Sequence, residues 1–174
     1  MSEFVKIPVE RVKVLLGPGQ SVKKKLEKRC NVELIVDAEG EVEIEGQPSD
    51  IFFARDVIKA IGRGFGPDAA LKLLTHDFGL YIIPLKEFTS SENAMSRIKG
   101  RVIGEKGKIK GQIEEATDSY LSIYGNTIAI ISRIDTMEYA KEAVGMIIDG
   151  ARLTSVLGYL AKAKREIMES RLRG

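Results

Sequence analysis

The sequence predicts an α+β protein built from two tandem β-α-α-β-β-α units, with a linker helix between them and a C-terminal helix after them. Three observations lead to this prediction. The two halves of the chain resemble each other, each half shows the same succession of strand and helix patterns, and a glycine-rich segment separates them. Internal similarity of this kind is typical of duplicated domains.

The internal repeat is clearest between residues 14–27 and 101–114. Both segments run from apolar residues through a glycine and a short turn into a basic helical pattern. When they are superposed, Gly17 falls on Gly104, and later positions agree in the same register. These later pairs are Val22 with Ile109, Leu26 with Ile113, Glu27 with Glu114, Leu34 with Leu121 and Val36 with Ile123.

The same order of elements is expected in each half. A short apolar strand precedes two helical patterns that flank the glycine turn. Two alternating strands with hairpin-turn residues between them follow, and a long apolar-periodic helix ends each unit. In the first half these elements are expected at 4–8, 9–16, 21–30, 32–37, 41–45 and 49–61, and in the second at 80–85, 93–103, 108–117, 120–124, 127–132 and 136–148.

The segment Gly62-Arg-Gly-Phe-Gly-Pro67 marks the division between the units, because glycine and proline interrupt regular structure. Pro67 is suited to the first turn of a helix, with Leu71, Leu74 and Phe78 on one face. The expected organisation is therefore a first unit at 1–66, a linker helix at 67–79, a second unit at 80–150 and a C-terminal helix at 151–174. The last helix has an apolar stripe that we expect to pack across the two units, made of Leu153, Val156, Leu157, Leu160 and Ile167.

Composition excludes several classes of protein. The chain has 174 residues, 44% of them hydrophobic, and no apolar run of about 18 residues that would indicate a membrane span. The N-terminal segment lacks a signal-peptide pattern, so we expect a cytoplasmic protein that contacts no membrane. Cys30 and His76 are the only residues of their types, which excludes an intramolecular disulfide and the usual structural zinc sites. We expect no cofactor, a packing role for Cys30 and a partly packed helical position for His76.

The formal net charge is only +2, but the charges are segregated along the chain. Residues 97–110 contain six basic residues and one acid, and residues 23–29 contain five basic residues and one acid. Residues 30–54 contain seven acids and no Lys or Arg. The average charge therefore conceals two basic patches and one acidic surface.

The segment Arg101-Val-Ile-Gly-Glu-Lys-Gly-Lys108 is the strongest functional signal in the chain. It places two glycines three residues apart between two helical patterns, with a lysine between them and another directly after. Glycine allows the backbone to approach a ligand closely. The N-terminus of the following helix favours an anion. The expected ligand is a nucleic-acid phosphate backbone.

A β-α-α-β-β-α unit with a GxxG loop between its first two helices resembles the type I KH domain. The second unit matches the KH pattern in Ile103-Gly-x-x-Gly-Lys108 and in the Ile113-Glu-Glu115 segment of its second helix. The first unit departs from it, because its loop reads Gly17-Pro-Gly-Gln20 and Pro18 lacks a backbone donor. We therefore do not expect the first unit to clamp RNA alone.

One degenerate KH-like unit followed by one intact unit looks like the archaeal members of the partner-of-Nob, or Dim, family. The segments Ala60-Ile-Gly-Arg-Gly-Phe-Gly-Pro67 and Gly100-Arg-Val-Ile-Gly104 add to this resemblance. The resemblance implies a non-catalytic RNA-binding protein that acts near the 3′ end of small-subunit rRNA during its maturation. It also implies a partner endonuclease that makes the final cleavage, and a translation initiation factor subunit as a further partner.

The expected RNA site lies in the second unit. Backbone N–H groups of Gly104, Glu105, Lys106 and Gly107 would meet phosphates, and Lys108 and Lys110 would add charge at the start of the next helix. Arg97 and Arg101 would extend the basic track. Bases would lie over an apolar groove, which we expect to be formed by Ile98, Val102, Ile103, Ile109 and Leu121.

Three other functions are alternatives to this one. An enzyme with a phosphate-binding P-loop is not supported, because Val102 occupies the first glycine position of GxxxxGK[ST] and Ile109 replaces the Ser or Thr. A protein–protein adaptor would suit the acidic first unit and the C-terminal helix. A generic KH protein of RNA decay or transcription is a third alternative.

Overall fold

The computed structural model describes residues 1–174 and divides them into two compact units, Met1–Leu80 and Tyr81–Gly174. The expected element order is confirmed in both. The first unit contains β1 (Ser2–Lys6), α1 (Val9–Leu16), α2 (Ser21–Cys30), β2 (Glu33–Val36), β3 (Glu41–Glu45), α3 (Pro48–Gly62) and α4 (Pro67–Ala70). The strand β4 (Phe78–Pro84) leads into α5 (Glu92–Ile103), α6 (Lys108–Thr117), β5 (Ser119–Tyr124), β6 (Thr127–Arg133), α7 (Met137–Ile148) and α8 (Leu153–Arg173).

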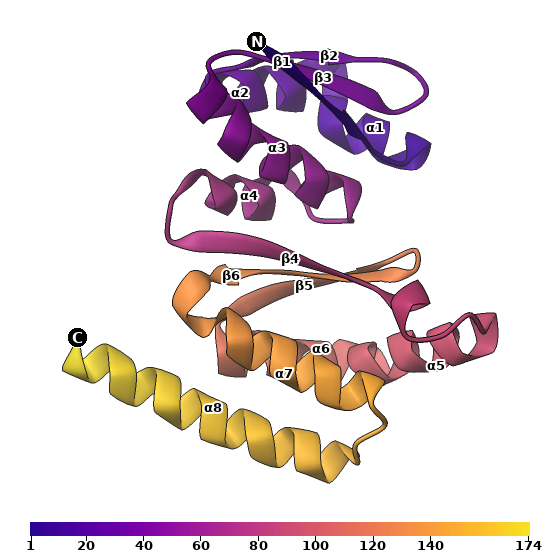
Figure 1. Ribbon diagram of the computed structural model, residues 1–174, viewed down its shortest axis with the longest axis vertical. Coiled ribbons are helices and arrows are strands. Elements are labelled where there is room, and N and C mark those ends of the chain that lie inside the picture. The colour runs from indigo at the N-terminus through magenta and orange to yellow at the C-terminus, as the bar shows by residue number, and fades with distance from the viewer. The chain divides into compact units, whose positions relative to one another are not determined.

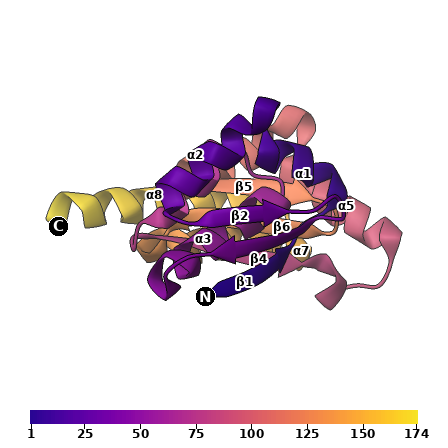
Figure 2. The ribbon, with the colours of Figure 1, turned by 90° about the horizontal axis from the view of Figure 1, so that it is seen from above.

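The first unit is a three-stranded antiparallel sheet in the order β1-β3-β2, with α1, α2 and α3 on one face (Figure 1). Alternation along the strands decides which face is covered, because successive side chains point to opposite sides. Val42 and Ile44 of β3 are fully buried toward the helices, whereas the glutamates that alternate with them, Glu41, Glu43 and Glu45, lie on the outer face. Figure 2 looks onto this sheet, with β1 and β2 as its outer strands.

The second unit has a sheet of the same kind in the order β4-β6-β5, covered on one face by α5, α6 and α7 (Figure 1). Its central strand β6 is buried from Ile128 to Ser132. Its hydrophobic core includes Leu85, Met95, Val102, Ile113, Ile128, Ile130, Val144 and Ile147.

Both units use the same carboxylate to attach the second helix to the sheet. The side chain of Glu27 accepts a hydrogen bond from the backbone N–H of Leu34 at 2.9 Å, and Glu114 does the same for Leu121 at 2.9 Å. These residues are equivalent in the sequence repeat. The conserved geometry within one chain shows that the repeat seen in the sequence is also a structural repeat.

The linker differs from the expectation of a single helix over 67–79. A helix does begin at Pro67, but α4 is only four residues long and a 3-10 turn at Leu71–Leu74 follows it. Phe78 is the first residue of β4 and does not belong to a helical face. His76 lies in the intervening turn, exposed, with its ring edge-on to Phe53 at a centroid distance of 5.0 Å. The prediction of a helical His76 was therefore wrong.

The C-terminal helix α8 packs on α6 and α7, within the second unit. Val156, Leu160, Ala163 and Ile167 are buried in this contact, whereas Leu153 is 45% exposed. The expectation that the stripe packs across the two units was wrong, because the faces of α6 and α7 provide its partner. Two ion pairs flank the contact with the end of α6, Lys164 with Glu115 at 2.8 Å and Arg171 with Asp118 at 2.7 Å.

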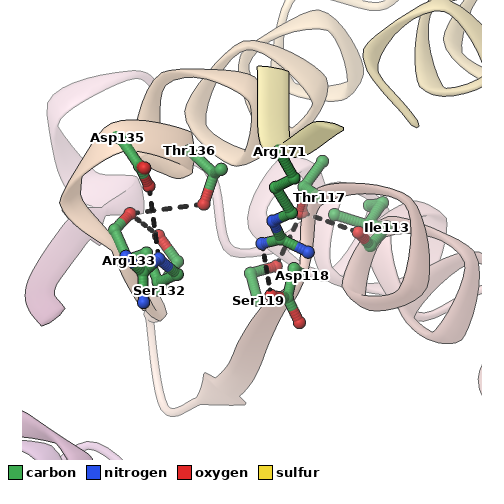
Figure 3. A network of polar contacts seen from close by, with 9 residues as sticks. All are labelled: Ile113, Thr117, Asp118, Ser119, Ser132, Arg133, Asp135, Thr136 and Arg171. Atoms are coloured by element: carbon green, nitrogen blue, oxygen red, sulfur yellow. Dashed lines mark hydrogen bonds and ion pairs between the residues drawn. The ribbon is translucent and has the colours of Figure 1, made fainter. Parts of the chain in front are cut away.

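The four buried polar residues of the chain lie in the network of Figure 3 and have hydrogen-bond partners. Thr117 donates to the carbonyl of Ile113 at 2.7 Å and shares a hydrogen bond of 2.8 Å with Ser119. Ser132 and Thr136 donate to the carbonyl of Arg133 at the end of β6. Satisfied buried hydroxyls avoid the desolvation cost of an unpaired polar group. No helix of the structure is both long enough and apolar enough to cross a membrane.

Candidate RNA-binding site

The GxxG loop joins α5 to α6 through three residues with left-handed backbone angles. Gly104 has φ 74° and ψ 176°, Lys106 has φ 53° and ψ 29°, and Gly107 has φ 74° and ψ 15°. The loop of the first unit has nearly the same angles at Gly17, Gly19 and Gln20. The two loops are thus one backbone conformation with different side chains.

The two glycines of the second loop serve different needs. A Cβ on Gly104 would overlap the side chain of Ile109 and approach its backbone nitrogen to 2.9 Å, so glycine lets α6 begin close against the end of α5. A Cβ on Gly107 would meet nothing within 4 Å. The only structural reason for glycine at position 107 is therefore its positive φ, which other residues rarely adopt.

The loop presents two backbone donors to solvent. The N–H of Gly104 donates to the carbonyl of Gly100 at 2.8 Å, and the N–H of Gly107 donates to the carbonyl of Gly104 at 3.2 Å. The N–H groups of Glu105 and Lys106 have no acceptor within the protein. Of the four N–H groups that the sequence predicted to contact phosphates, only those of Glu105 and Lys106 are free to do so. The other two, of Gly104 and Gly107, form hydrogen bonds within the turn.

Three exposed cations of the predicted site have no acidic partner. Lys106 stands at the tip of the loop, Lys108 opens α6, and Arg97 lies on α5. The N-terminus of α6 adds the partial positive charge of a helix start. Glu105 is the one acid beside them, and it is exposed. The local charge favours an anion with at least two oxygens, as a phosphate backbone provides.

Two of the predicted cations are engaged elsewhere. Arg101 donates to the carbonyl of Ile147 at 2.8 Å and also to that of Ala151, so its guanidinium caps the end of α7. Lys110 is half-buried and pairs with Glu114 at 3.2 Å. Arg101 and Lys110 therefore have structural contacts within the protein, and they are less available to a phosphate than Lys106 and Lys108.

The predicted apolar groove is divided between core and surface. Val102, Ile109 and Leu121 are 0%, 7% and 4% exposed and belong to the core, so their side chains support the site from below. Ile98 is half-buried, and Ile103 is 36% exposed beside Gly104. Of the predicted groove residues, Ile103 and Ile98 have the side chains best placed for contact with bases.

Lys99 was not among the predicted site residues, yet it connects two sides of the unit. Its ammonium donates to the carbonyl of Gly125 at 3.0 Å and lies 3.4 Å from the side-chain oxygen of Asn126. It thereby ties α5 to the β5–β6 turn. The turn chemistry of Gly125-Asn126 located the hairpin in the sequence, but no local pattern paired it with a lysine 26 residues away.

The first unit keeps the loop conformation and loses part of its donor set. Pro18 stands where Glu105 stands in the second unit, and proline has no N–H to offer. Between α1 and β2 the first unit has an apolar pocket, lined by Val9, Val12, Lys13, Leu16, Val36, Asp37 and Ala38. The outer sheet face of this unit is acidic, with Glu41, Glu43 and Glu45 along β3 and Glu33 opposite Glu45. Desolvation of the Glu45 carboxyl raises its pKa most, and the neighbouring charges of Glu43 and Glu33 raise it further.

No group of three or more His, Cys, Asp and Glu side chains is placed to hold a metal ion. Cys30 is buried at the end of α2, and desolvation raises the pKa of its thiol to about 11. A thiol with this pKa is protonated at neutral pH and is a poor nucleophile. The packing role expected for Cys30 agrees with its burial.

Two β-α-α-β-β-α units, each with a left-handed loop between its first two helices, make this chain a tandem protein of the type I KH class, a class of RNA-binding domains. Comparison with family models agrees. A general KH-domain model matches residues 2–60, and a eukaryotic-type, type I KH model for the second KH domain of PNO1 matches residues 79–165. The chain belongs to the PNO1/Dim2 family of tandem KH-domain proteins.

Two curated relatives illustrate the relationship. A KH domain-containing protein of Methanocaldococcus jannaschii is 41% identical over 97% of this chain and 77% of its own length. The pre-rRNA-processing protein pno1 of Aspergillus fumigatus is 33% identical over 66% of this chain. The match spans 46% of that fungal protein, which is less than half of its length.

Solved structures show the same fold. Dim2p from Pyrococcus horikoshii superposes with a TM-score of 0.87 at 38% identity, covering 93% of this chain and 99% of that one. A protein of unknown function from Aeropyrum pernix gives a TM-score of 0.91 at 34% identity, covering 99% and 96%. A Pyrococcus horikoshii chain in a complex of a/eIF2alpha, aDim2p and rRNA gives a TM-score of 0.88 at 38% identity, covering 95% of each chain.

Proposed function

We propose that this protein binds single-stranded RNA through the loop and the first helix of its second unit, and that its target lies near the 3′ end of small-subunit rRNA. The observation that supports this most strongly is the pair of unpartnered N–H groups at Glu105 and Lys106, beside cations without acidic partners. KH loops of this kind hold the backbone of about four nucleotides.

The choice of target rests on the relatives. The fungal family members are named pre-rRNA-processing proteins, and a homologous chain has been crystallised with a/eIF2alpha and rRNA. By this homology the protein acts as an assembly or processing factor together with a partner endonuclease. A subunit of a translation initiation factor is a second expected partner. In this role the protein contributes binding and positioning of RNA in the cytoplasm, and the partner contributes the cleavage.

A second role, as a protein adaptor, is supported by the outer sheet face of the first unit. The glutamates of β3 on this face repel a phosphate backbone. They favour a basic protein surface instead. If both roles are present, the second unit binds RNA and the first unit binds a protein. A generic KH protein of RNA decay or transcription would share the RNA site and differ in its target.

Fluorescence anisotropy with a labelled RNA that copies the 3′ end of archaeal small-subunit rRNA tests the proposal, beside a scrambled RNA of equal length. The variant Glu105→Asp/Lys106→Asp lowers the charge of the second loop by two. Aspartate is among the residues that tolerate left-handed angles, so the fold should persist. The matched control Pro18→Asp/Gly19→Asp makes the same charge change in the first loop, where Gly19 has open space around it.

Preference for the rRNA end that is lost in the second-loop variant and kept in the first-loop control supports the whole proposal. Equal binding of both RNAs, lost in the second-loop variant, keeps the RNA site and moves the function to the generic KH alternative. Unchanged affinity in the folded second-loop variant contradicts the assigned site. Circular dichroism melting of each variant shows that it is folded.

A further inference from the structure

A pocket lies against the GxxG loop on the side of α7 and α8. Its volume is about 350 Å³, within the range of roughly 300–1,000 Å³ usual for ligand pockets. It is lined by Arg101, Gly104, Glu105, Lys108, Ile109, Ile147 and Leu153. The pocket shares Ile109 with the predicted apolar groove, whereas Ile147 of α7 and Leu153 of α8 belong to the pocket and not to that groove.

The walls of this pocket have a clear chemical character. Ile109 and Ile147 are 7% and 1% exposed and form an apolar floor. Lys108 is exposed at the rim without an acidic partner. Arg101 forms one wall, and its two hydrogen bonds to Ile147 and Ala151 hold the start of α8 in place beside the loop. The pocket therefore joins an apolar floor to a cationic edge.

Leu153 is an exposed apolar residue at the mouth of this pocket. It is the first residue of α8 and is 45% exposed, whereas Val156 and Leu160, in the next turns of the helix, are buried. A large apolar side chain at the lip of a pocket provides surface for a flat apolar ligand. Here the ligand must tolerate a neighbouring cation and lie close to the phosphate-binding loop.

The geometry points to a nucleobase subsite: we infer that the nucleotide next to those held by the loop places its base in this pocket, between Leu153 and the floor formed by Ile109 and Ile147. This inference rests on the proposed RNA-binding function and deepens it. Gly104, Glu105 and Lys108 belong both to the loop site and to the pocket, so a single nucleotide can reach both. The RNA contact then extends beyond the four nucleotides of one KH groove.

The test compares a four-nucleotide and an eight-nucleotide RNA, with 2-aminopurine placed at each position of the longer one in turn. The variant is Leu153→Asp, and an acidic residue in the first turn of a helix is favourable for its stability. The matched control is Met168→Asp. Met168 is 55% exposed on the same helix, ~22 Å further along it at 1.5 Å per residue, and its substitution adds the same charge.

We expect Leu153→Asp to weaken binding of the eight-nucleotide RNA about tenfold, because a base would lose apolar contact and meet a carboxylate. Affinity for the four-nucleotide RNA should change less than twofold, as should every affinity of the Met168→Asp control. One 2-aminopurine outside the four groove positions should change its fluorescence on binding, and this change should vanish in Leu153→Asp.

Equal effects of Leu153→Asp on both RNAs, or no effect on either, would overturn the subsite. The Glu105→Asp/Lys106→Asp variant separates this failure from that of the proposed function. If that variant loses RNA binding while Leu153→Asp behaves like its control, the loop site stands and the subsite is wrong. If that variant binds RNA normally, the proposed function fails and the subsite fails with it.

Discussion

Replacing Lys106 with glutamine should reduce the salt dependence of RNA binding by a calculable amount. Three exposed cations of the predicted site lack acidic partners, Arg97, Lys106 and Lys108. Each cation that neutralises a phosphate of a single strand contributes about −0.7 to the slope of log affinity against log salt concentration. Three contacts predict a slope of about −2, and two contacts predict about −1.4.

The consequence is measurable over a fourfold change in salt. Between 50 and 200 mM, a slope of about −2 lowers affinity roughly 16-fold, and a slope of about −1.4 lowers it roughly sevenfold. Fluorescence anisotropy titrations at four salt concentrations give both slopes. Lys164→Gln is the matched control, because Lys164 is paired with Glu115 on α6 and should leave the slope unchanged. A slope that stays the same in Lys106→Gln refutes the assignment of this lysine to a phosphate.

Three further predictions concern the fold around the site. Gly104→Ala should lower the free energy of unfolding by about 2–4 kcal/mol, against about 1 kcal/mol for Gly107→Ala, because only the first Cβ also overlaps Ile109; equal effects in urea titrations would contradict this. Arg101→Gln should lower the melting temperature by several degrees, since two carbonyls at the end of α7 lose a charged donor; an unchanged temperature would show that these bonds add nothing. The thiol of Cys30, whose pKa is raised to about 11, should resist alkylation at pH 8 until the protein unfolds; rapid alkylation of the folded protein would contradict the burial. Its contribution to the free energy of unfolding should be present below about pH 9 and should decline as the pH rises toward 11.

Much of the fold follows from local patterns in the sequence. Alternating strands, helix periodicity and the glycine turns locate both units, because these signals depend on residues close together in the chain. The linker was mispredicted for the same reason. Pro67 begins a helix, and Leu71, Leu74 and Phe78 fit one helical face, yet Phe78 pairs in β4. Strand pairing is a long-range interaction that overrides local periodicity.

The candidate site shows the same limit at the level of side chains. The sequence located the loop and its cations, and the structure keeps Lys106 and Lys108 exposed. It did not indicate that Arg101 would cap the end of α7, because its acceptors are 46 and 50 residues away. The role of Glu114 was signalled by the repeat, since Glu27 occupies the equivalent position. Comparing the two halves was more informative there than inspecting either half alone.

The central claim is that RNA is held by the two unpartnered N–H groups of the second loop. An NMR titration of the ¹⁵N-labelled protein with the rRNA 3′-end oligonucleotide observes these groups directly. The account predicts that the amide signals of Glu105 and Lys106 shift most, while those of Gly19 and Gln20 in the first loop stay in place. Dominant shifts in the first loop, with the signals of Glu105 and Lys106 unmoved at saturation, would contradict it.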